Sequence, residues 1–468
     1  MSQVAEHGST GGEKTTSGDT SETQASIRRA EATSKTRCRA IILVPFFALL
    51  SGPVWCATAL PEPLTLQAAL DSAHNPAHFE LIEIEQRLQA RAAEFGIERG
   101  NNDFRLDLTG RLREVGLNDT ADDNGEDDGG DNAASLILSK PLYDFGLQDS
   151  LESRNELQMH ALQQQQVLLI EQRRLQILEK YFAVLNADNH FLSENEALAI
   201  GFIRYDNAVQ DQELGLASEI EVLRLQTEYE MIRQKRQLAE QHQRLSRSIL
   251  AEAMGYPGQL SSELEKPQID TQRKLPGDIN ALVTRVLHNS LEARVATANT
   301  RAAQAAIAIA DAEGGPSLDL ELELSTYERE TRTRDDWRAG LYIEIPLYSG
   351  SSPARVNLAM AQYRQALASQ QQLESQLRLE VLRLWQQLQR LQLEIVGRNI
   401  EQEYRDRYLD RSRAEYELEY KSDLGDSMVL YSRSNAERLR ALYAFELAWQ
   451  RLASLAGAQY LKASNSTQ

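Results

Sequence analysis

The fold is decided by one stretch, Tyr348 to Gly457, whose centre is LRLEVLRLWQQLQRLQLEI at residues 377–395. Apolar residues recur there at alternating spacings of four and three, which is the heptad seam of helices packed against helices. The seam consists of Leu377, Val381, Leu384, Leu388, Leu391 and Ile395. No proline follows Pro353, so a helix of roughly 65 residues, about 100 Å long, is predicted. Such a rod must lie in a bundle, and the interruption at Tyr420–Met428 marks where the chain turns back.

The composition of the 468-residue chain favours long helices over several globular domains. Charged residues make up 25% of the chain and there are only 12 prolines, while apolar residues are spread along amphipathic stretches. The net charge of −19 gives no support to nucleic-acid binding, which needs a basic face. No nucleophile elbow, phosphate loop or paired-carboxylate site is present in the sequence, so we predict neither an enzyme activity nor a cofactor or metal.

Residues 1–59 are interpreted as an N-terminal extension and a secretory signal peptide. Basic residues precede an apolar run of about eleven residues, Ala40–Leu50, which is too short to span a bilayer, and Ala57-Thr58-Ala59 supplies a small-x-small cleavage site. A short buried or membrane-anchoring helix is the alternative. Cys38 and Cys56 both precede the cleavage site, so no disulfide or thiolate metal site is expected in the mature chain. Acylation of Cys56 is disfavoured because the bulky Trp55 stands before it.

Two segments, residues 104–140 and 317–346, show no helical period. Apolar and polar residues alternate in them, which predicts a β-hairpin in each. Every strand in them has one apolar and one polar face and about ten residues, the length that a tilted strand needs to cross the hydrocarbon layer. Four strands cannot close a barrel with an aqueous interior, and an open sheet edge is forbidden in lipid. If these strands span a membrane, several chains must contribute them to one barrel.

The two hairpins belong to an internal duplication, with a first repeat at 60–255 and a second at 279–457. Each repeat is predicted to contain a helix, a hairpin, a long helix, a tip and a returning helix. The tips lie near 215 and near 425. In the first repeat, Asn75-Pro76 breaks the opening helix.

The remaining segments are short. Residues 256–278 form a proline-containing linker between the repeats, and residues 458–468 form a C-terminal tail. The opening helix of the second repeat is predicted to be continuous over Ile279–Ala312.

The order and spacing of several short motifs resemble those of the TolC family of outer-membrane factors. The motifs are Pro141-Leu142-Tyr143, Ile345-Pro346-Leu347-Tyr348-Ser349-Gly350, Gly215-Leu216-Ala217-Ser218-Glu219-Ile220-Glu221-Val222-Leu223 and Ser422-Asp423-Leu424-Gly425-Asp426. The resemblance implies an α+β membrane protein that forms a homotrimer. Its long α-helical, coiled-coil tunnel would lie in the periplasm, and four transmembrane strands per chain would complete a twelve-stranded barrel in the outer membrane of a Gram-negative bacterium.

The resemblance also implies a function and partners. The protein would be the exit duct of a tripartite efflux pump or a type I secretion system, and a passive conduit. It would be surrounded by outer-membrane lipid, would dock with a periplasmic adaptor (membrane fusion) protein and would serve an inner-membrane ABC, RND or MFS transporter. The linker would form an equatorial collar.

The tips carry the site residues that the resemblance implies. Asp423 and Asp426 resemble the acidic constriction that closes the family's tunnel, and Lys421 is a candidate ion-pair partner. The alternative is that both aspartates only cap the returning helix. The candidates for the tip surface and adaptor contacts are Gly215, Ser218, Glu219, Glu221, Lys421, Ser422 and Gly425. Helix capping is an alternative role for Glu219 and Glu221.

Three further interpretations concern the whole chain, the acidic loop and a pair of histidines. A periplasmic or cell-envelope coiled-coil scaffold would explain the heptads but not the duplicated hairpins. The acidic loop at 118–132 is either solvated or a Ca²⁺ site, although its spacing misses the EF-hand pattern. His74 and His78 are one turn apart, but Pro76 lies between them, so a surface role is expected in place of metal binding.

Overall fold

The computed structural model describes residues 62–115, 129–259, 262–328, 334–418 and 423–457. The predicted signal peptide, both cysteines, most of the acidic loop, Lys421, Ser422 and the C-terminal tail lie outside these ranges.

Long helices dominate the described part of the chain. The first repeat contains α1 (Leu66–Asp71), the 3₁₀ turn η1 (Ser72–His74), α2 (Phe79–Gly100), α3 (Leu147–Glu213) and α4 (Glu219–Met254). The second contains α5 (Ile279–Asn289), α6 (Leu291–Ala312), α7 (Ser352–Glu417) and α8 (Leu424–Ala456). The two long helices have 67 and 66 residues, and the length of α7 agrees with the roughly 65 residues that the heptad stretch predicts. Within the described ranges, no helix is both long and apolar enough to cross a membrane.

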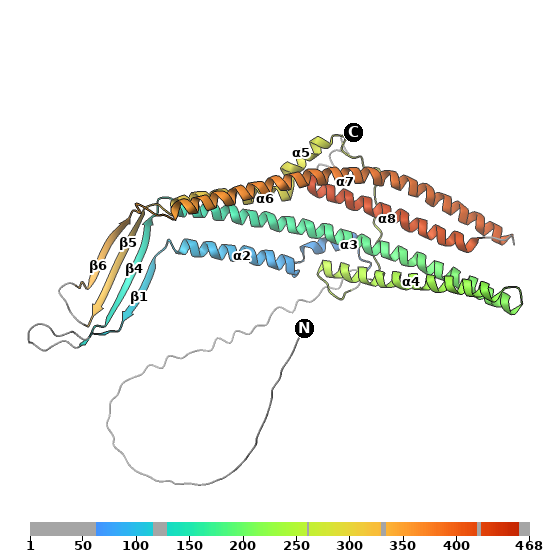
Figure 1. Cartoon of the computed structure of the whole chain (residues 1–468), viewed down its shortest axis with the longest axis horizontal. Helices are drawn as coiled ribbons and strands as arrows, with labels where there is room; N and C mark the ends of the chain where they lie inside the picture. Colours follow the sequence, from blue (N-terminus) through green and yellow to red (C-terminus); the bar gives the residue numbers. More distant parts are fainter. Residues whose placement is uncertain (1–61, 116–128, 260–261, 329–333, 419–422, 458–468) are drawn as a thin grey trace, which may run out of the picture. The chain divides into compact units, whose positions relative to one another are not determined.

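The long helices α3 and α7 organise the bundle, because each packs against shorter helices along its length. Figure 1 shows α2 and α4 beside successive parts of α3, and α6 and α8 beside successive parts of α7. The helix α3 also contacts α6 and α8, which joins the two repeats. All six predicted heptad residues of α7 are buried, with at most 5% of their surface exposed, and they pack with Phe445, Trp449 and Leu452 of α8.

The opening helix of the second repeat is not continuous, contrary to the prediction over Ile279–Ala312. The chain is extended at Ser290, and α5 ends at Asn289. The hydroxyl of Ser290 accepts the backbone N–H of Ala293 at 3.2 Å and caps α6. The first repeat has its break at the expected place, because η1 ends at His74 and α2 begins at Phe79, with Asn75-Pro76 between them.

The four main strands form one antiparallel sheet in the order β1-β4-β5-β6. These strands are β1 (Arg105–Arg111), β4 (Ala133–Tyr143), β5 (Ser317–Tyr327) and β6 (Trp337–Glu344). A short pair, β2 (Glu114–Val115) and β3 (Gly129–Gly130), extends the first hairpin. The pairing of β4 with β5 joins the hairpins of the two repeats. With 7 and 8 residues, β1 and β6 are shorter than the ten predicted.

The linker between α4 and α5 is held by side-chain hydrogen bonds from both repeats. The hydroxyl of Tyr181 donates to the carbonyls of Leu64 and Glu265 at 2.9 and 2.7 Å, and Trp385 Nε1 donates to the carbonyl of Pro276 at 3.2 Å. Tyr181 in α3 and Trp385 in α7 therefore play the same part in the two repeats.

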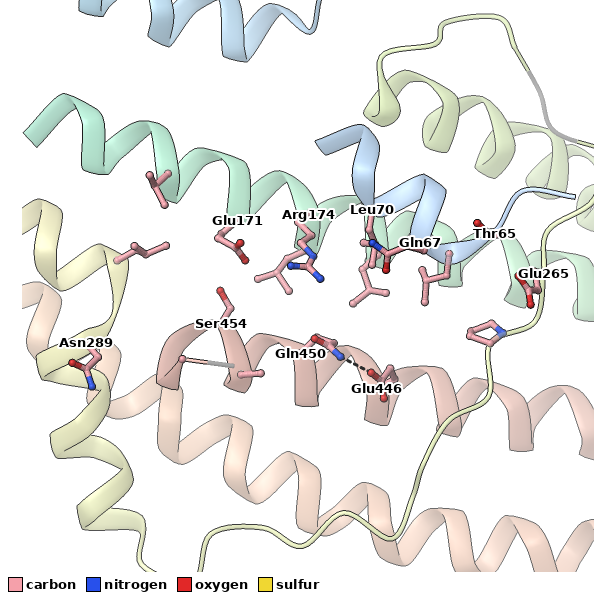
Figure 2. A pocket seen from close by; sticks show the side chains of 18 residues that line it. Thr65, Gln67, Leu70, Glu171, Arg174, Glu265, Asn289, Glu446, Gln450 and Ser454 are labelled. Carbon is pink, nitrogen blue, oxygen red and sulfur yellow. Dashed lines mark hydrogen bonds between the residues drawn. The ribbon is translucent and has the colours of Figure 1, made fainter. Parts of the chain in front are cut away.

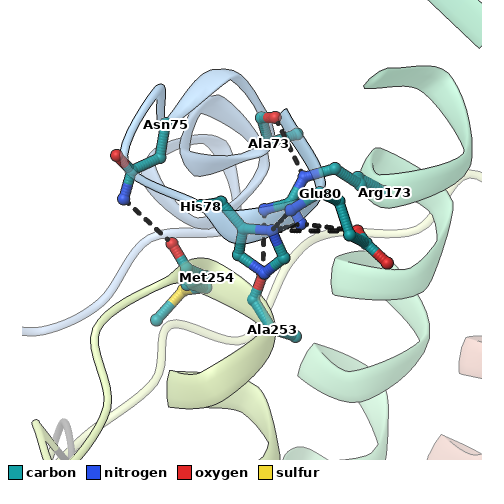
Figure 3. A network of polar contacts seen from close by, with 7 residues as sticks. All are labelled: Ala73, Asn75, His78, Glu80, Arg173, Ala253 and Met254. Atoms are coloured by element: carbon teal, nitrogen blue, oxygen red, sulfur yellow. Dashed lines mark hydrogen bonds and ion pairs between the residues drawn. The ribbon is translucent and has the colours of Figure 1, made fainter. Parts of the chain in front are cut away.

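A buried arginine fixes the junction where α4 ends and α2 begins. Arg173 of α3 is 2% exposed and donates to Glu80 Oε2 at 2.9 Å and to the carbonyls of Ala73 and Ala253 at 3.3 and 3.2 Å. Figure 3 shows the imidazole of His78 in the same network, against the guanidinium. One cation thus ties three segments of the first repeat together.

His78 does not have the surface role expected from the sequence. Its side chain is buried, and its Nδ1 accepts the backbone N–H of Glu80 at 3.3 Å, so it caps α2. Burial and the neighbouring Arg173 lower the pKa of His78, so the imidazole is neutral at pH 7. His74 takes no part in this network.

Replacing Arg173 is expected to destabilise the protein. In Arg173→Leu, two carbonyls and Glu80 lose their partner. The free energy of unfolding is expected to fall by about 3 kcal/mol. Chemical denaturation of the purified protein, followed by circular dichroism, measures it. Arg174→Leu is the matched control, because Arg174 is exposed; equal losses in both variants would contradict the proposed role of the network.

Candidate functional site

The sheet has one apolar and one charged face, as the sequence alternation predicts. In one row of paired residues, Leu106, Leu138, Leu322 and Ala339 lie side by side across the four strands. In the next row, on the opposite face, Asp107, Ile137, Glu323 and Arg338 do. On this face, the side chain of Arg338 forms an ion pair with Glu323, and that of Arg105 forms one with Asp107 at 2.7 Å. The charged face can line water, and the apolar face can meet lipid.

A buried aspartate joins the hairpins at the end of the sheet remote from the helices. Asp131 is 1% exposed and accepts from three arginines, Arg113 at 2.5 Å, Arg334 at 2.9 Å and Arg111 at 3.2 Å. Its carboxylate is therefore already paired with arginine side chains. The interpretation of 118–132 as a solvated loop is wrong for this residue, and so is a Ca²⁺ site that includes it.

The first tip is a tight turn between α3 and α4. Gly215 has a φ of 76°, a left-handed conformation that favours glycine. The hydroxyl of Ser218 accepts the backbone N–H of Glu221 at 3.2 Å and caps α4. The cap is thus the serine, and Glu219 and Glu221 lie in the first helical turn, where carboxylates are favoured.

The surface of this tip combines exposed leucine and isoleucine side chains with an ion pair. Leu214, Leu216 and Ile220 are 73–80% exposed. A hydrogen bond from Arg224 to Glu221, at 2.5 Å, lowers the pKa of that carboxyl. Large apolar side chains exposed together on a soluble surface mark a site for a partner.

The second tip brings together some of its predicted residues. Asp423 occupies the N-cap position of α8, but its side chain makes no capping hydrogen bond. Asp426 lies in the first turn and forms an ion pair with Arg204 of α3 at 2.5 Å. Asp423 therefore does not cap α8 through its side chain, whereas Asp426 lies in the first turn, where a carboxylate is favoured, and also pairs with Arg204. Lys421, the predicted partner of these aspartates, lies outside the described residues.

Gly425 lets α8 approach α3 closely beside this ion pair. A Cβ atom at position 425 would lie 2.7 Å from Cγ2 of Ile200. Sequence patterns missed both Ile200 and Arg204, because they stand in the first repeat, far along the chain from the tip that they contact. The sequence signal that could have found this contact is a basic residue on α3 close to the tip, Arg204, as a partner for the tip carboxylates.

A cavity of about 700 Å³ lies between α1, α3, α8 and the linker (Figure 2). Leu291, at the start of α6, and Gly457, just after α8, both line it, so it marks the junction of the second repeat's short helices. Glu171, Arg174 and Glu265 point into it among apolar residues. Within the described ranges, no group of three or more His, Cys, Asp or Glu side chains is arranged to hold a metal ion.

Comparison with known proteins identifies the fold. No family model and no curated protein matches the chain significantly. Solved structures do match. VceC, an outer membrane protein of Vibrio cholerae, is 17% identical with a TM-score of 0.63, over 84% of this chain and 96% of VceC. The CmeC outer membrane channel of Campylobacter jejuni is 14% identical with a TM-score of 0.67, over 86% of this chain and 89% of CmeC.

The open state of a third channel has the same architecture. The MtrE outer membrane channel of Neisseria gonorrhoeae is 15% identical with a TM-score of 0.65, and the match covers 84% of this chain and 89% of MtrE. The chain therefore has the fold of these outer-membrane channels, with helices and sheet in one protomer. At the level of the fold, the family resemblance is confirmed.

The close approach of α8 to α3 makes Gly425 sensitive to substitution. Gly425→Ala is expected to lower the free energy of unfolding by about 1–3 kcal/mol because the added methyl group overpacks against Ile200. Denaturation of the purified protein measures the change, and in an Ile200→Ala background the same Gly425→Ala substitution should cost less, because the clashing side chain is gone.

Gly397→Ala is the matched control. Gly397 lies within α7 and has open space around it, so alanine should stabilise the helix there by about 0.5–1 kcal/mol. The same loss in both glycine variants would contradict the packing argument.

Proposed function

We propose that this chain, which has the fold of outer-membrane channels, is the exit duct of a tripartite efflux pump or type I secretion system. The observation that carries the proposal is the two-faced sheet joined directly to helices of 67 and 66 residues. Such a protomer offers a water-lined wall that continues from the hydrocarbon layer into a helical tunnel, which would lie in the periplasm.

Closure of that wall requires several copies. Within the described sheet, β1 pairs only with β4 and β6 only with β5, so both outer edges carry unpaired backbone groups. Unpaired groups are not tolerated in lipid. Three chains would join β1 of one to β6 of the next and give twelve strands, a number that leaves room for an aqueous interior.

The tips are the proposed contact for a periplasmic adaptor protein. The exposed side chains of Leu214, Leu216 and Ile220 offer apolar surface at the first tip. The Glu221–Arg224 pair next to them supplies polar groups at the rim of that surface. An inner-membrane ABC, RND or MFS transporter, joined through the adaptor, would supply the energy, and this chain would act as a passive conduit.

Asp423 and Asp426 form the proposed gate at the second tip. In a trimer, three copies of each carboxylate would approach one axis, where they repel one another and attract cations. The ion pair between Asp426 and Arg204 gives the closed tip an additional restraint, because it ties α8 to α3 within one protomer. Opening by an outward movement of α8 would have to break this pair.

The channel function is tested by fractionation and electrical recording. We expect the full-length protein in outer membranes as a trimer that dissociates on heating, and discrete conductance steps when purified protein is added to planar bilayers. Recovery only in the cytosol or periplasm, with no oligomer and no conductance, would contradict the proposal.

Removing the gate carboxylates should open the tip. Asp423→Ala combined with Asp426→Ala is expected to raise the single-channel conductance and to weaken block by multivalent cations, because the acidic constriction is lost. Arg204→Ala should raise conductance without weakening that block.

The charge swap Arg204→Asp with Asp426→Arg separates the ion pair from the acidic ring, since it restores the pair and should restore low conductance. Asp410→Ala, an exposed position on α7, is the control. Wild-type conductance and block in the double alanine variant would remove the gating role.

A further inference from the structure

The apolar face of the sheet carries one charged side chain among its described strand residues, Lys140. In the sheet register Lys140 pairs with Leu320, which in turn pairs with Leu341. The adjacent row on the same face consists of Leu106, Leu138, Leu322 and Ala339. A lysine on a lipid-facing surface is costly at the middle of a bilayer and tolerated near its edge. Lys140 stands close to the edge, because β4 ends at Tyr143 and α3 begins at Leu147.

A β-bulge places a tyrosine on the same face. Simple alternation would put Leu142 beside Lys140, but the register shifts between Pro141 and Tyr143. Tyr143 therefore pairs with Leu318, the neighbour of Leu320 on the apolar face. The bulge thus brings an ammonium group and a phenol to adjacent positions at the helix end of the sheet.

Two phenylalanines complete this cluster. The ammonium group of Lys140 lies 4.1 Å from the ring centroid of Phe104, in a cation–π contact. The ring of Phe145 meets that of Tyr143 edge-on, with centroids 4.7 Å apart. Both phenylalanines are more than half exposed.

Phe145 is held in a conformation that bulky residues avoid. Its φ is 53°, the left-handed region, although its ring gains little burial from the arrangement. Strain without a packing gain points to a role outside the chain. Aromatic rings gather where a membrane protein crosses the boundary between hydrocarbon and water.

The nearby carboxylates do not neutralise Lys140. Asp103 accepts the backbone N–H of Phe104 at 2.8 Å, and Asp144 accepts those of Gly146 and Gln148 at 3.2 and 2.7 Å. Within the described part of the chain, no ion pair involves Lys140. The charge is therefore available to an anion from outside.

We propose that Lys140 and Tyr143 bind the phosphodiester of a bilayer phospholipid at the helix end of the sheet. The ammonium group and the phenol donate to the phosphate oxygens. The rings of Phe104 and Phe145 lie at the level of the glycerol, and the acyl chains lie along the leucines. This inference rests on the proposed outer-membrane location.

Lipid titration of the purified trimer tests the proposal. The trimer is held in a maltoside detergent, which contains no phosphate, and dihexanoyl phosphatidylglycerol is added while native mass spectrometry counts bound lipids. One lipid per chain should bind saturably to the wild type. Lys140→Met should weaken that binding by about tenfold, since a charge-assisted hydrogen bond is lost.

Two further variants separate the charge from a general effect. Lys140→Arg should retain binding, and Lys180→Met, a lysine of α3 beside Glu179, should leave it unchanged. Unchanged binding in Lys140→Met would overturn the proposal. So would equal binding of dihexanoylglycerol, which has no phosphate, or displacement of the lipid by an equal concentration of inorganic phosphate.

Bilayer recordings of the same preparations distinguish this site from the channel function. Normal conductance together with wild-type lipid binding in Lys140→Met would overturn the lipid site alone. Lipid binding that depends on Lys140, in a protein that never conducts, would overturn the channel function alone.

Discussion

Backbone hydrogen bonding at the two open sheet edges is the constraint on which the proposed assembly depends. The outer edges of β1 and β6 leave N–H and C=O groups unpaired in the described sheet, and hydrocarbon offers them no partner. A sheet edge in water can form hydrogen bonds with the solvent. In this sheet, however, placing the edges in water would also expose the apolar face of leucines, which is unfavourable. In the proposed assembly, neighbouring copies would supply the partners for these edges, and the same symmetry would bring the tips of the helices to one axis.

The two repeats share a plan but differ in the chemistry of their junctions. In the first repeat, the charged Arg173 holds the meeting point of α2 and α4 through carbonyl groups and Glu80. In the second, α7 packs against α5 and α8 through an apolar cluster that includes Leu377. A buried charge must keep its hydrogen-bonding partners, because a buried charge left without them is strongly destabilising. The arginine thus fixes where the N-terminal helices join the bundle.

Local periodicity allowed much of the fold to be predicted. The heptad positions from Leu377 to Ile395 are buried as expected, and strict alternation located both hairpins, because each signal is contained in a few consecutive residues. The break at Ser290 was missed, since serine is unremarkable within a helical pattern until its hydroxyl caps the next helix. The contacts of Asp426 with Arg204 and of Gly425 with Ile200 join residues more than 200 positions apart, and no local pattern encodes them.

The joint between β4 and α3 has a mechanical consequence. Gly146 also has a left-handed φ, and Asp144 clamps the first turn of α3 through two backbone N–H groups. Beyond this joint, α3 runs for 67 residues, a lever of about 100 Å at 1.5 Å per residue. An angular error of about 5° at such a joint would carry the far end of the lever sideways by about 9 Å. The stiffness of two or three residues next to the sheet therefore limits how accurately the distant tip can be aimed.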